Sequence, residues 1–145
     1  MVKFKTGNLF NAPKGSYLAH ACNCMGGWGP VIAAKFKKLF PNSYREYKNF
    51  CDDGAKPGDV FVCSEENGYR VLCLFTSAGY SARKDSKSDI IEATKTALQK
   101  LPTDAPIHMP LINAGQFGVP WENTAPLLIQ YDDMDITVWT YDGTD

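Results

Sequence analysis

Two glycine-rich segments of the chain could hold phosphate oxygens with their backbone N–H groups. Residues 113–122 are Asn-Ala-Gly-Gln-Phe-Gly-Val-Pro-Trp-Glu, and residues 23–32 are Asn-Cys-Met-Gly-Gly-Trp-Gly-Pro-Val-Ile. Glycines just before a helix let the backbone turn its N–H groups outward, and a helix N-terminus favours anions. One such loop is weak evidence, because glycine also closes ordinary loops. Two of them, each between a predicted strand and a predicted helix, suggest a pyrophosphate held from both sides.

His20 is the outstanding candidate for proton transfer, because imidazole can donate or accept a proton near neutral pH. The alternative is a core histidine with a satisfied hydrogen bond. His20 lies three residues before Asn23, so the two side chains would project to opposite faces of an ideal strand unless its end is kinked. Asp85 could orient water or act as a base, and it or Ser86 could equally cap the following helix. The candidate catalytic residues are therefore His20, Asn23 and Asp85.

The cysteines do not form a recognisable metal motif. Cys22-x-Cys24 lacks the spacing and the second ligand pair of a zinc site, and motifs of metal-dependent or Cys-x5-Arg phosphatases are absent from the sequence. We therefore expect no metal and no cofactor. Five cysteines, an odd number, favour free thiols in a reducing, cytoplasmic setting. Cys24 remains open as a nucleophile.

Length, charge and hydropathy describe an ordinary globular chain. We expect a single domain over residues 1–145, because 145 residues can bury roughly two-thirds of their unfolded surface. The net charge of −1 gives no broad electrostatic footprint for nucleic acid, and the lysines in 35–38 are interpreted as the solvated face of a helix. No apolar run approaches the ~20 residues of a membrane span. We expect a monomer without membrane contact, whose partner is a small molecule.

Hydrophobic periodicity and turn residues predict strands interleaved with helices. Pro30 opens the first helix and Pro41 stops it, while Ser43 and Glu46 have the spacing of a capping box for the second. The pattern implies a three-layer α/β/α sandwich, in which a hairpin makes the central sheet mixed. The predicted strands cover 2–6, 16–23, 59–64, 70–77, 107–112 and 135–141, and the predicted helices cover 30–40, 43–53, 86–101 and 121–131.

Polar or glycine-rich residues follow the ends of several predicted strands. In α/β folds ligands gather at the carboxyl ends of strands. Asn8, Asn23, Ser77, the 113–120 loop and Tyr141 all hold such positions, so they can share one rim. This convergence is the strongest structural argument for a single site.

The order of elements and the motifs resemble those of macrodomains, the ADP-ribose-binding α/β/α fold. The resemblance runs nearly end to end, and the paired loops make it specific. It rests on Gly7-Asn8-Leu9, on His20-Ala21-Cys22-Asn23-Cys24 with Gly26-Gly27-Trp28-Gly29 and Val31-Ile32-Ala33, and on Ile112-Asn113-Ala114-Gly115-Gln116-Phe117-Gly118.

Within that fold the sequence is most similar to the small ADP-ribose 1″-phosphate phosphatases, which act on a by-product of tRNA splicing. The likeness lies at 20–24, 28–29, 73–77 and 117–121, and it implies hydrolysis of ADP-ribose 1″-phosphate to ADP-ribose and phosphate. A sister branch, the terminal ADP-ribose glycohydrolases, carries a catalytic Lys and Asp where this chain has Ser77 and Phe117. Two alternatives remain: a non-catalytic reader of ADP-ribose or other NAD-derived nucleotides, and an ADP-ribosyl hydrolase acting on modified protein or nucleic acid.

The resemblance also implies roles for individual residues. Asn8, where the family has Asp, would meet the adenine edge, and Tyr141 would stack on the adenine ring. Asn23 would bind a hydroxyl of the distal ribose, and Phe117 would pack under that ribose. Asn8 could instead be only a turn residue, Tyr141 only an exposed strand end, and Trp28 a lid or core aromatic. The expected ligand-binding residues are Asn8, Leu9, Gly27, Trp28, Gly29, Val31, Ser77, Asn113, Gly115, Gln116, Phe117, Gly118 and Tyr141.

Overall fold

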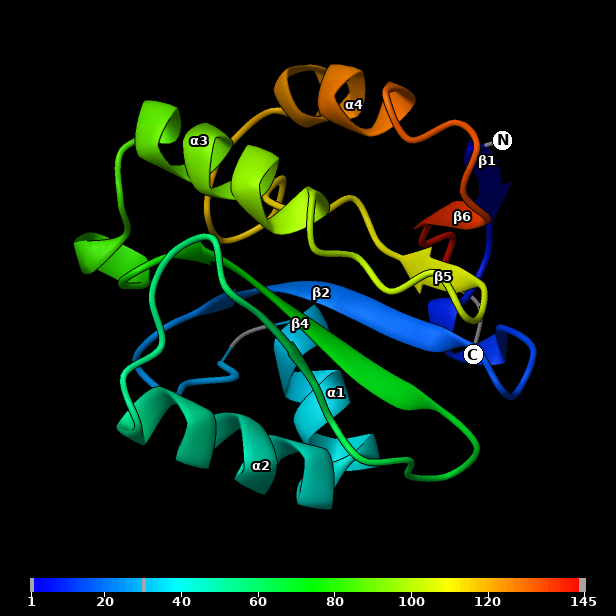
Figure 1. The fold of residues 1–145 in the computed structure, drawn as a ribbon, viewed down its shortest axis with the longest axis horizontal. Coiled ribbons are helices and arrows are strands. Elements are labelled where there is room, and N and C mark those ends of the chain that lie inside the picture. The colour runs from blue at the N-terminus through cyan, green and yellow to red at the C-terminus, as the bar shows by residue number, and fades with distance from the viewer. Residues whose placement is uncertain (1, 30, 144–145) are drawn as a thin grey trace.

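The computed structural model describes residues 2–29 and 31–143 and contains a six-stranded sheet. Figure 1 shows helices on both faces of this sheet. The strands lie in the order β1-β6-β5-β2-β4-β3. All neighbours run parallel except β3, which pairs antiparallel with β4, so the predicted hairpin and mixed sheet are confirmed. The strands are β1 (Val2–Thr6), β2 (Tyr17–Asn23), β3 (Val60–Val62), β4 (Arg70–Ser77), β5 (Ile107–Met109) and β6 (Ile136–Thr140).

Two helices cover each face of the sheet. α1 and α2 lie on one side, and α3 and α4 lie on the other (Figure 1), which confirms the three-layer α/β/α sandwich. Among the described residues, no helix combines the length and the apolar character needed to cross a membrane. The helices are α1 (Ile32–Leu39), α2 (Pro41–Asp52), α3 (Lys87–Leu98) and α4 (Trp121–Ile129), with short 3-10 turns η1 (Leu9–Asn11) and η2 (Ser81–Arg83).

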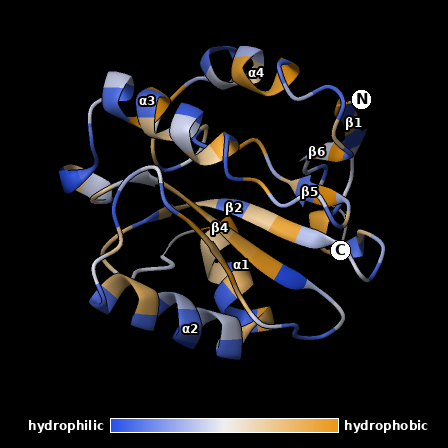
Figure 2. Cartoon of the chain, in the orientation of Figure 1, coloured by the Kyte–Doolittle hydropathy of each residue, from blue (hydrophilic) through white to orange (hydrophobic). Residues whose placement is uncertain are grey.

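The central strands are buried on both faces, and so they are continuous apolar runs rather than alternating ones. Figure 2 shows this apolar band along β2 and β4. In β4, Val71 and Phe75 belong to the core beneath α1 and α2, whereas Leu72 and Leu74 belong to the core beneath α3 and α4. The same alternation decides which layer each polar side chain of β2 and β4 reaches.

The start of α2 differs from its prediction. The sequence predicts Ser43 as the N-cap, but α2 begins at Pro41, a position that proline favours because its fixed φ suits the first helical turn. The N–H and the Oγ of Ser43 both donate to Glu66 Oε1 at 2.9 Å. The capping-box prediction is wrong, because a carboxylate from the β3–β4 connection takes the place of the local partner.

Two other element ends are set by proline or by a local cap. β5 ends at Met109 rather than at 112, because Pro110 has no N–H for the ladder. Ser86, one of the two predicted caps of α3, accepts the N–H of Asp89 at 3.2 Å. The first helix begins at Ile32, and the predicted opening residue Pro30 lies outside the described residues.

A buried hydrogen bond joins β5 to β6. Trp139 Nε1 donates to His108 Nδ1 at 2.9 Å. Burial lowers the pKa of His108, so the ring stays neutral and can accept this bond. His108 is therefore a structural residue of the sheet.

We expect acid to weaken the fold through His108. Because the pKa of His108 is lower in the folded chain than in the unfolded one, the residue contributes stability above about pH 6.5 that is lost as the pH falls. In His108→Gln an amide oxygen can still accept from Trp139 but does not titrate. Urea denaturation at about pH 7.5 and about pH 5 should show a larger loss of unfolding free energy in the wild type than in the variant. Equal losses would contradict this.

Candidate ligand-binding site

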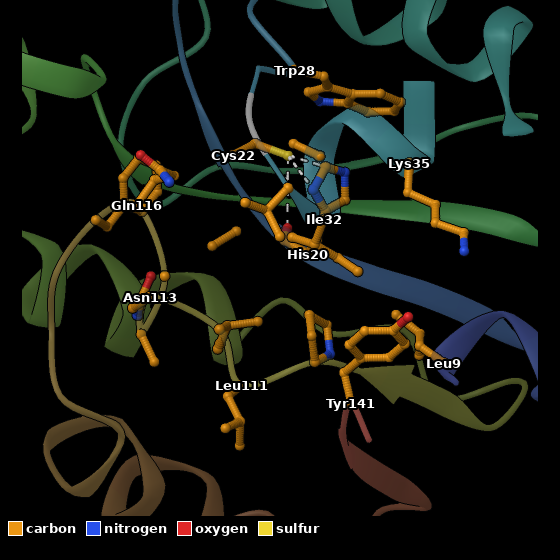
Figure 3. A pocket seen from close by; sticks show the side chains of 18 of the residues that line it. Leu9, His20, Cys22, Trp28, Ile32, Lys35, Leu111, Asn113, Gln116 and Tyr141 are labelled. Carbon is orange, nitrogen blue, oxygen red and sulfur yellow. Dashed lines mark hydrogen bonds between the residues drawn. The ribbon is translucent and has the colours of Figure 1, made fainter. Parts of the chain in front are cut away.

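A cleft of about 520 Å³ opens at the carboxyl ends of β1, β2, β5 and β6, and the segments that follow these strands form its wall (Figure 3). Most of the predicted site residues come together here, as the shared rim requires. Ser77, Asp85 and Gly118 lie outside the lining. The predicted residues that line the cleft are Asn8, Leu9, His20, Asn23, Gly27, Trp28, Gly29, Val31, Asn113, Gly115, Gln116, Phe117 and Tyr141.

The carboxamide of Asn23 organises the first glycine-rich loop. Its Oδ1 accepts the N–H of Met25 at 2.9 Å, the N–H of Gly27 at 3.3 Å and the hydroxyl of Tyr47 at 3.0 Å. Its Nδ2 donates to the carbonyl of Gly27 at 2.7 Å. An amide nitrogen carries two N–H groups, so one remains for a ligand in the cleft. Asn23 is thus a loop-forming residue with one donor to spare.

A register shift in the pairing of β2 with β4 falls between Cys22 and Asn23. Such an irregularity re-aims the side chain that follows it. It supplies the kink that an ideal strand lacks, so His20 and Asn23 both line the cleft.

His20 is packed among aromatic rings and a thiol. Its ring stacks on Phe36 with 4.1 Å between centres and meets Trp28 edge-on at 4.8 Å. Its two nitrogens lie 3.5 and 3.8 Å from Cys22 Sγ. His20 is therefore a core residue that also lines the cleft, and its role in proton transfer stays a prediction.

The two thiols of the first motif differ in acidity. Burial raises the pKa of the Cys22 thiol, but hydrogen bonding with Cys73 and the neighbouring His20 outweigh burial and lower the pKa to about 6. Burial raises the pKa of Cys24 to about 12. Because the thiolate is the nucleophilic form, Cys24 is a poor nucleophile.

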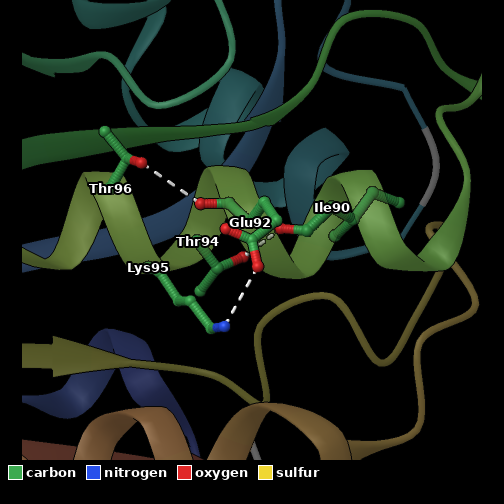
Figure 4. A network of polar contacts seen from close by, with 5 residues as sticks. All are labelled: Ile90, Glu92, Thr94, Lys95 and Thr96. Atoms are coloured by element: carbon green, nitrogen blue, oxygen red, sulfur yellow. Dashed lines mark hydrogen bonds and ion pairs between the residues drawn. The ribbon is translucent and has the colours of Figure 1, made fainter.

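The second loop is anchored by the carboxamide of Asn113. Its Oδ1 accepts the hydroxyl of Thr76 at 2.8 Å, and its Nδ2 donates to Thr94 Oγ1 at 3.0 Å and Thr124 Oγ1 at 3.5 Å. Thr94 in turn donates to the carbonyl of Ile90 at 2.7 Å, one turn earlier in α3 (Figure 4). One side chain thus ties the loop to β4, α3 and α4. Both amide N–H groups are used, so Asn113 serves the cleft by holding its wall.

Both loops leave backbone N–H groups free. No acceptor within the described residues takes the N–H groups of Gly115, Gln116 and Phe117. In the same described part of the chain, the N–H groups of Ile32 and Ala33 at the start of α1 have no acceptor, and Val31 before them provides no side-chain cap. Turn and helix N–H groups of this kind attract anions. The residues that carry the two sets line one cleft, an arrangement that suits a diphosphate held from both sides.

Ser77 and Asp85 fold the loop between β4 and α3 instead of lining the cleft. Ser77 Oγ donates to the carbonyl of Gly79 at 2.7 Å and accepts the N–H of Asp85 at 3.0 Å. The Asp85 carboxylate accepts the N–H of Ala78 at 2.9 Å. The Ser77 hydroxyl, predicted to bind the ligand, and the Asp85 carboxylate, predicted to be catalytic, are thus engaged in local hydrogen bonds. The third residue outside the lining, Gly118, lies beside the exposed Lys84.

Lys35 and Tyr80 are among the residues outside the predicted ligand-binding set that also line the cleft. Lys35 is half-buried, and its Nζ lies 5.7 Å from the ring centre of Phe10. Placing it on the solvated helix face is wrong, because the first turns of α1 border the cleft. Tyr80 stands opposite Gly27, where an added Cβ would lie 3.4 Å from its ring. Among the described lining residues, Lys35 is the one with a formal charge, and Figure 3 shows it at the end of the cleft near Leu9 and Tyr141.

A mixed α/β/α sandwich with two glycine-rich loops at the carboxyl ends of parallel strands defines a class of α/β domains that bind ligands at that edge of the sheet. The chain belongs to the Macro domain family, whose model matches residues 19–128. It is similar to the ADP-ribose 1″-phosphate phosphatase of Debaryomyces hansenii, with 33% identity over 98% of this chain and 100% of the relative. The phosphatase of the same name from Candida albicans is 35% identical over 96% of this chain and 99% of the relative.

Solved macrodomain structures share the fold. The macrodomain of Mycobacterium tuberculosis DarG superposes with a TM-score of 0.80 at 25% identity, covering 97% of each chain. Thermosipho africanus DarTG, solved in complex with ADP-ribose, gives a TM-score of 0.70 at 18% identity over 96% of this chain and 41% of that one. At that identity the likeness is one of fold.

Two substitutions of Asn113 should separate its carboxamide from its backbone. Asn113 has a φ of 67°, in the left-handed region that glycine adopts freely. We expect Asn113→Gly to lose about 2–3 kcal/mol of unfolding free energy through the lost hydrogen bonds. Asn113→Ala should lose about 1 kcal/mol more, because its Cβ disfavours this φ. Urea denaturation measures both, with Gln116→Ala in the same loop as a near-neutral control. An unaffected Asn113→Gly would show that the carboxamide does not anchor the loop.

Proposed function

We propose that this chain hydrolyses ADP-ribose 1″-phosphate to ADP-ribose and inorganic phosphate. The observation that carries the proposal is the pair of loops whose free N–H groups face one cleft. Relatives named for this activity align with 96–98% of the chain, which supports the choice of substrate.

The chemistry of the wall suggests one orientation of the ligand. The diphosphate lies between the free N–H groups of the two loops. Adenine lies at the end formed by Leu9 and Tyr141, where Tyr141 is 63% exposed and free to stack. Asn8 uses its Oδ1 to accept the N–H of Phe10 at 2.9 Å, which leaves its Nδ2 for the adenine edge. The distal ribose then meets the spare N–H of Asn23 and the ring of Phe117.

Hydrolysis breaks the bond between phosphorus and the ribose oxygen while water attacks phosphorus. The equatorial oxygens need hydrogen-bond donors, and the leaving oxygen needs a proton. The free loop N–H groups that the diphosphate does not engage can supply the donors. His20 can supply the proton, since its ring lines the cleft and has a thiol rather than a carboxylate as its neighbour. Asp85 would reach the substrate only after the 78–85 loop moves, and its role as a base stays a prediction.

One observation favours the alternative of a non-catalytic reader. No carboxylate lines the cleft among the residues that the structure describes, and His20 is 1% exposed beneath Phe36 and Trp28. A protein with this cleft could sequester ADP-ribose without turning over its phosphate. The remaining alternative, an ADP-ribosyl hydrolase, would use Asn23 and a water positioned by the substrate's diphosphate.

The setting of the reaction is also a proposal. We keep the expectation of a monomer in a reducing cytoplasm, because five thiols suit such a compartment. There the substrate would be the by-product of tRNA splicing on which the resembling phosphatases act. Size-exclusion chromatography with light scattering tests the monomer.

Phosphate release from ADP-ribose 1″-phosphate should be detectable with the purified chain and with metal chelated. We expect Asn23→Ala to abolish it and His20→Ala to lower kcat by about 100-fold or more, as removal of a general acid does. Asp85→Ala tests the predicted base against Asp89→Ala, an acid that lines the same shallow hollow beside α3.

The failures of this experiment are distinguishable. If ADP-ribose raises the Tm but no phosphate appears, the chain is a non-catalytic protein that binds ADP-ribose. If label is instead lost from an ADP-ribosylated protein or DNA, the chain is an ADP-ribosyl hydrolase. If His20→Ala and Asp89→Ala retain equal activity, His20 is not the acid.

Lys35 should contribute electrostatic attraction to the bound nucleotide. Lys35 is the one residue with a formal charge among the described residues that line the cleft. The variant Lys35→Met should therefore bind ADP-ribose about tenfold more weakly at low salt. The difference should shrink at high salt through screening. Isothermal titration calorimetry measures both, and Lys37→Met is the control, since Lys37 lies over Tyr44 and outside the cleft lining. Equal losses in both variants would show that only the overall charge matters.

A further inference from the structure

Three soft donor side chains meet on the sheet face beneath α1 and α2. His20 and Cys22 are two residues apart on β2, so they point to the same face. Cys73 on β4 is the register partner of His20 and belongs to the core of the same face. The three are at most 2% exposed, and their ligand atoms all lie within 4.8 Å of one another. The cluster thus forms through strand pairing rather than through a spacing along the chain.

The distances in this cluster fit tetrahedral zinc. With Zn–N of about 2.0 Å and Zn–S of about 2.3 Å, a bound imidazole nitrogen and thiolate stand about 3.5 Å apart. The Nε2 of His20 lies 3.5 Å from Cys22 Sγ. Because no ligand pair exceeds 4.8 Å, closure of Cys73 onto the ion needs a shift of at most about 1 Å.

We propose that His20, Cys22 and Cys73 form a binding site for a thiophilic divalent cation of the zinc class. Two thiolates and one neutral imidazole balance the charge of the ion, which burial otherwise penalises. His20 and Cys22 line the cleft, whereas Cys73 is not part of its lining. A fourth ligand, water or a substrate oxygen, would therefore enter from the cleft.

The residue above the cluster provides an independent reason for a charged acceptor there. Trp28 Nε1 is buried and has no hydrogen-bond acceptor among the described residues. Its ring lies edge-to-face with His20 at 4.8 Å, and Figure 3 shows it over Cys22 and His20. A metal-bound thiolate is a stronger acceptor than a thiol, so its formation would satisfy the orphan N–H. Outer hydrogen bonds of this kind are the usual support of metal ligands.

Cobalt(II) is the probe that tests the site. The reduced, chelator-stripped chain should bind one Co²⁺ and show a thiolate-to-cobalt charge-transfer band with the visible bands of tetrahedral cobalt. Loss of a residue that only hydrogen-bonds to a metal ligand weakens metal binding by up to about 100-fold. Cys22→Ala and Cys73→Ala remove a ligand itself, so each should weaken Co²⁺ binding by more than that. The matched control is Cys24→Ala, because its half-buried thiol is not part of the cluster. Circular dichroism melting confirms that each variant is folded.

Each outcome of the cobalt experiment either supports or overturns the metal site. A charge-transfer band that survives Cys24→Ala and disappears in both cluster variants supports the site. A wild-type chain without that band, or a band retained in Cys22→Ala and Cys73→Ala, overturns it. Zn²⁺ should compete for the cobalt site and bleach the band, and failure to do so would also contradict the assignment to zinc.

The site has a consequence that rests on the proposed phosphatase. A metal would occupy the His20 lone pair that proton transfer needs, so Zn²⁺ should lower phosphate release by the wild type. It should not lower release by Cys73→Ala, whose side chain lies outside the cleft lining. If the chain releases no phosphate at all, the proposed function fails while the cobalt spectrum still decides the metal site. If both proteins are equally inhibited, the inhibition comes from another site and the assignment of His20 is wrong.

Discussion

The Asn113 carboxamide is the interaction on which the cleft depends. It is held by hydroxyls from β4, α3 and α4, and it so joins three elements through one side chain. Apolar packing is not directional, so it can hold layers together without fixing the orientation of a loop. Hydrogen bonds to three fixed hydroxyls are directional. They hold the following backbone in a conformation whose N–H groups stay unpaired.

Asn23 fixes the orientation of the first loop, on the other side of the cleft, in the same way. Its amide accepts from the loop and from Tyr47 of α2, so the first loop is tied to the helical layer below the sheet. The two asparagines differ in what they leave over. Asn113 spends both N–H groups on the protein, whereas Asn23 keeps one. This difference follows from their positions: Asn113 anchors the wall of the cleft, whereas Asn23 lies where a ligand hydroxyl can bind.

Much of the fold could be predicted from the sequence because many of its elements depend on residues that are close together along the chain. The strand at 2–6, the apolar run in 70–77 and the cap at Ser86 all depend on neighbours along the chain, and each appears in the structure. The alternation in 2–6 does not bury one face of β1, since Phe4 is 62% exposed. The predicted start of α2 does not appear, because its decisive partner is Glu66, 23 residues from Ser43. Asp85 fails for a similar reason. Its carboxylate is captured by the N–H of Ala78, which lies seven residues earlier.

Lys35 shows a different limit. Its neighbours Lys37 and Lys38 are exposed, and composition cannot tell which lysine of a short run turns toward a ligand. Only the angle at which α1 leaves the first loop decides this. The angle in turn depends on Val31, whose φ of 55° is unusual for a β-branched residue.

The His20 cluster depends on register, which no spacing along one strand contains. A shift of one residue between β2 and β4 would send Cys73 to the opposite core and leave His20 and Cys22 without it. The same pairing then breaks between Cys22 and Asn23, where the side chain turns to the cleft. Cys22 thus belongs to the buried cluster and also lines the cleft, while the adjacent Asn23 joins the ligand site. A strand without that irregularity could present one or the other at the cleft, but not both.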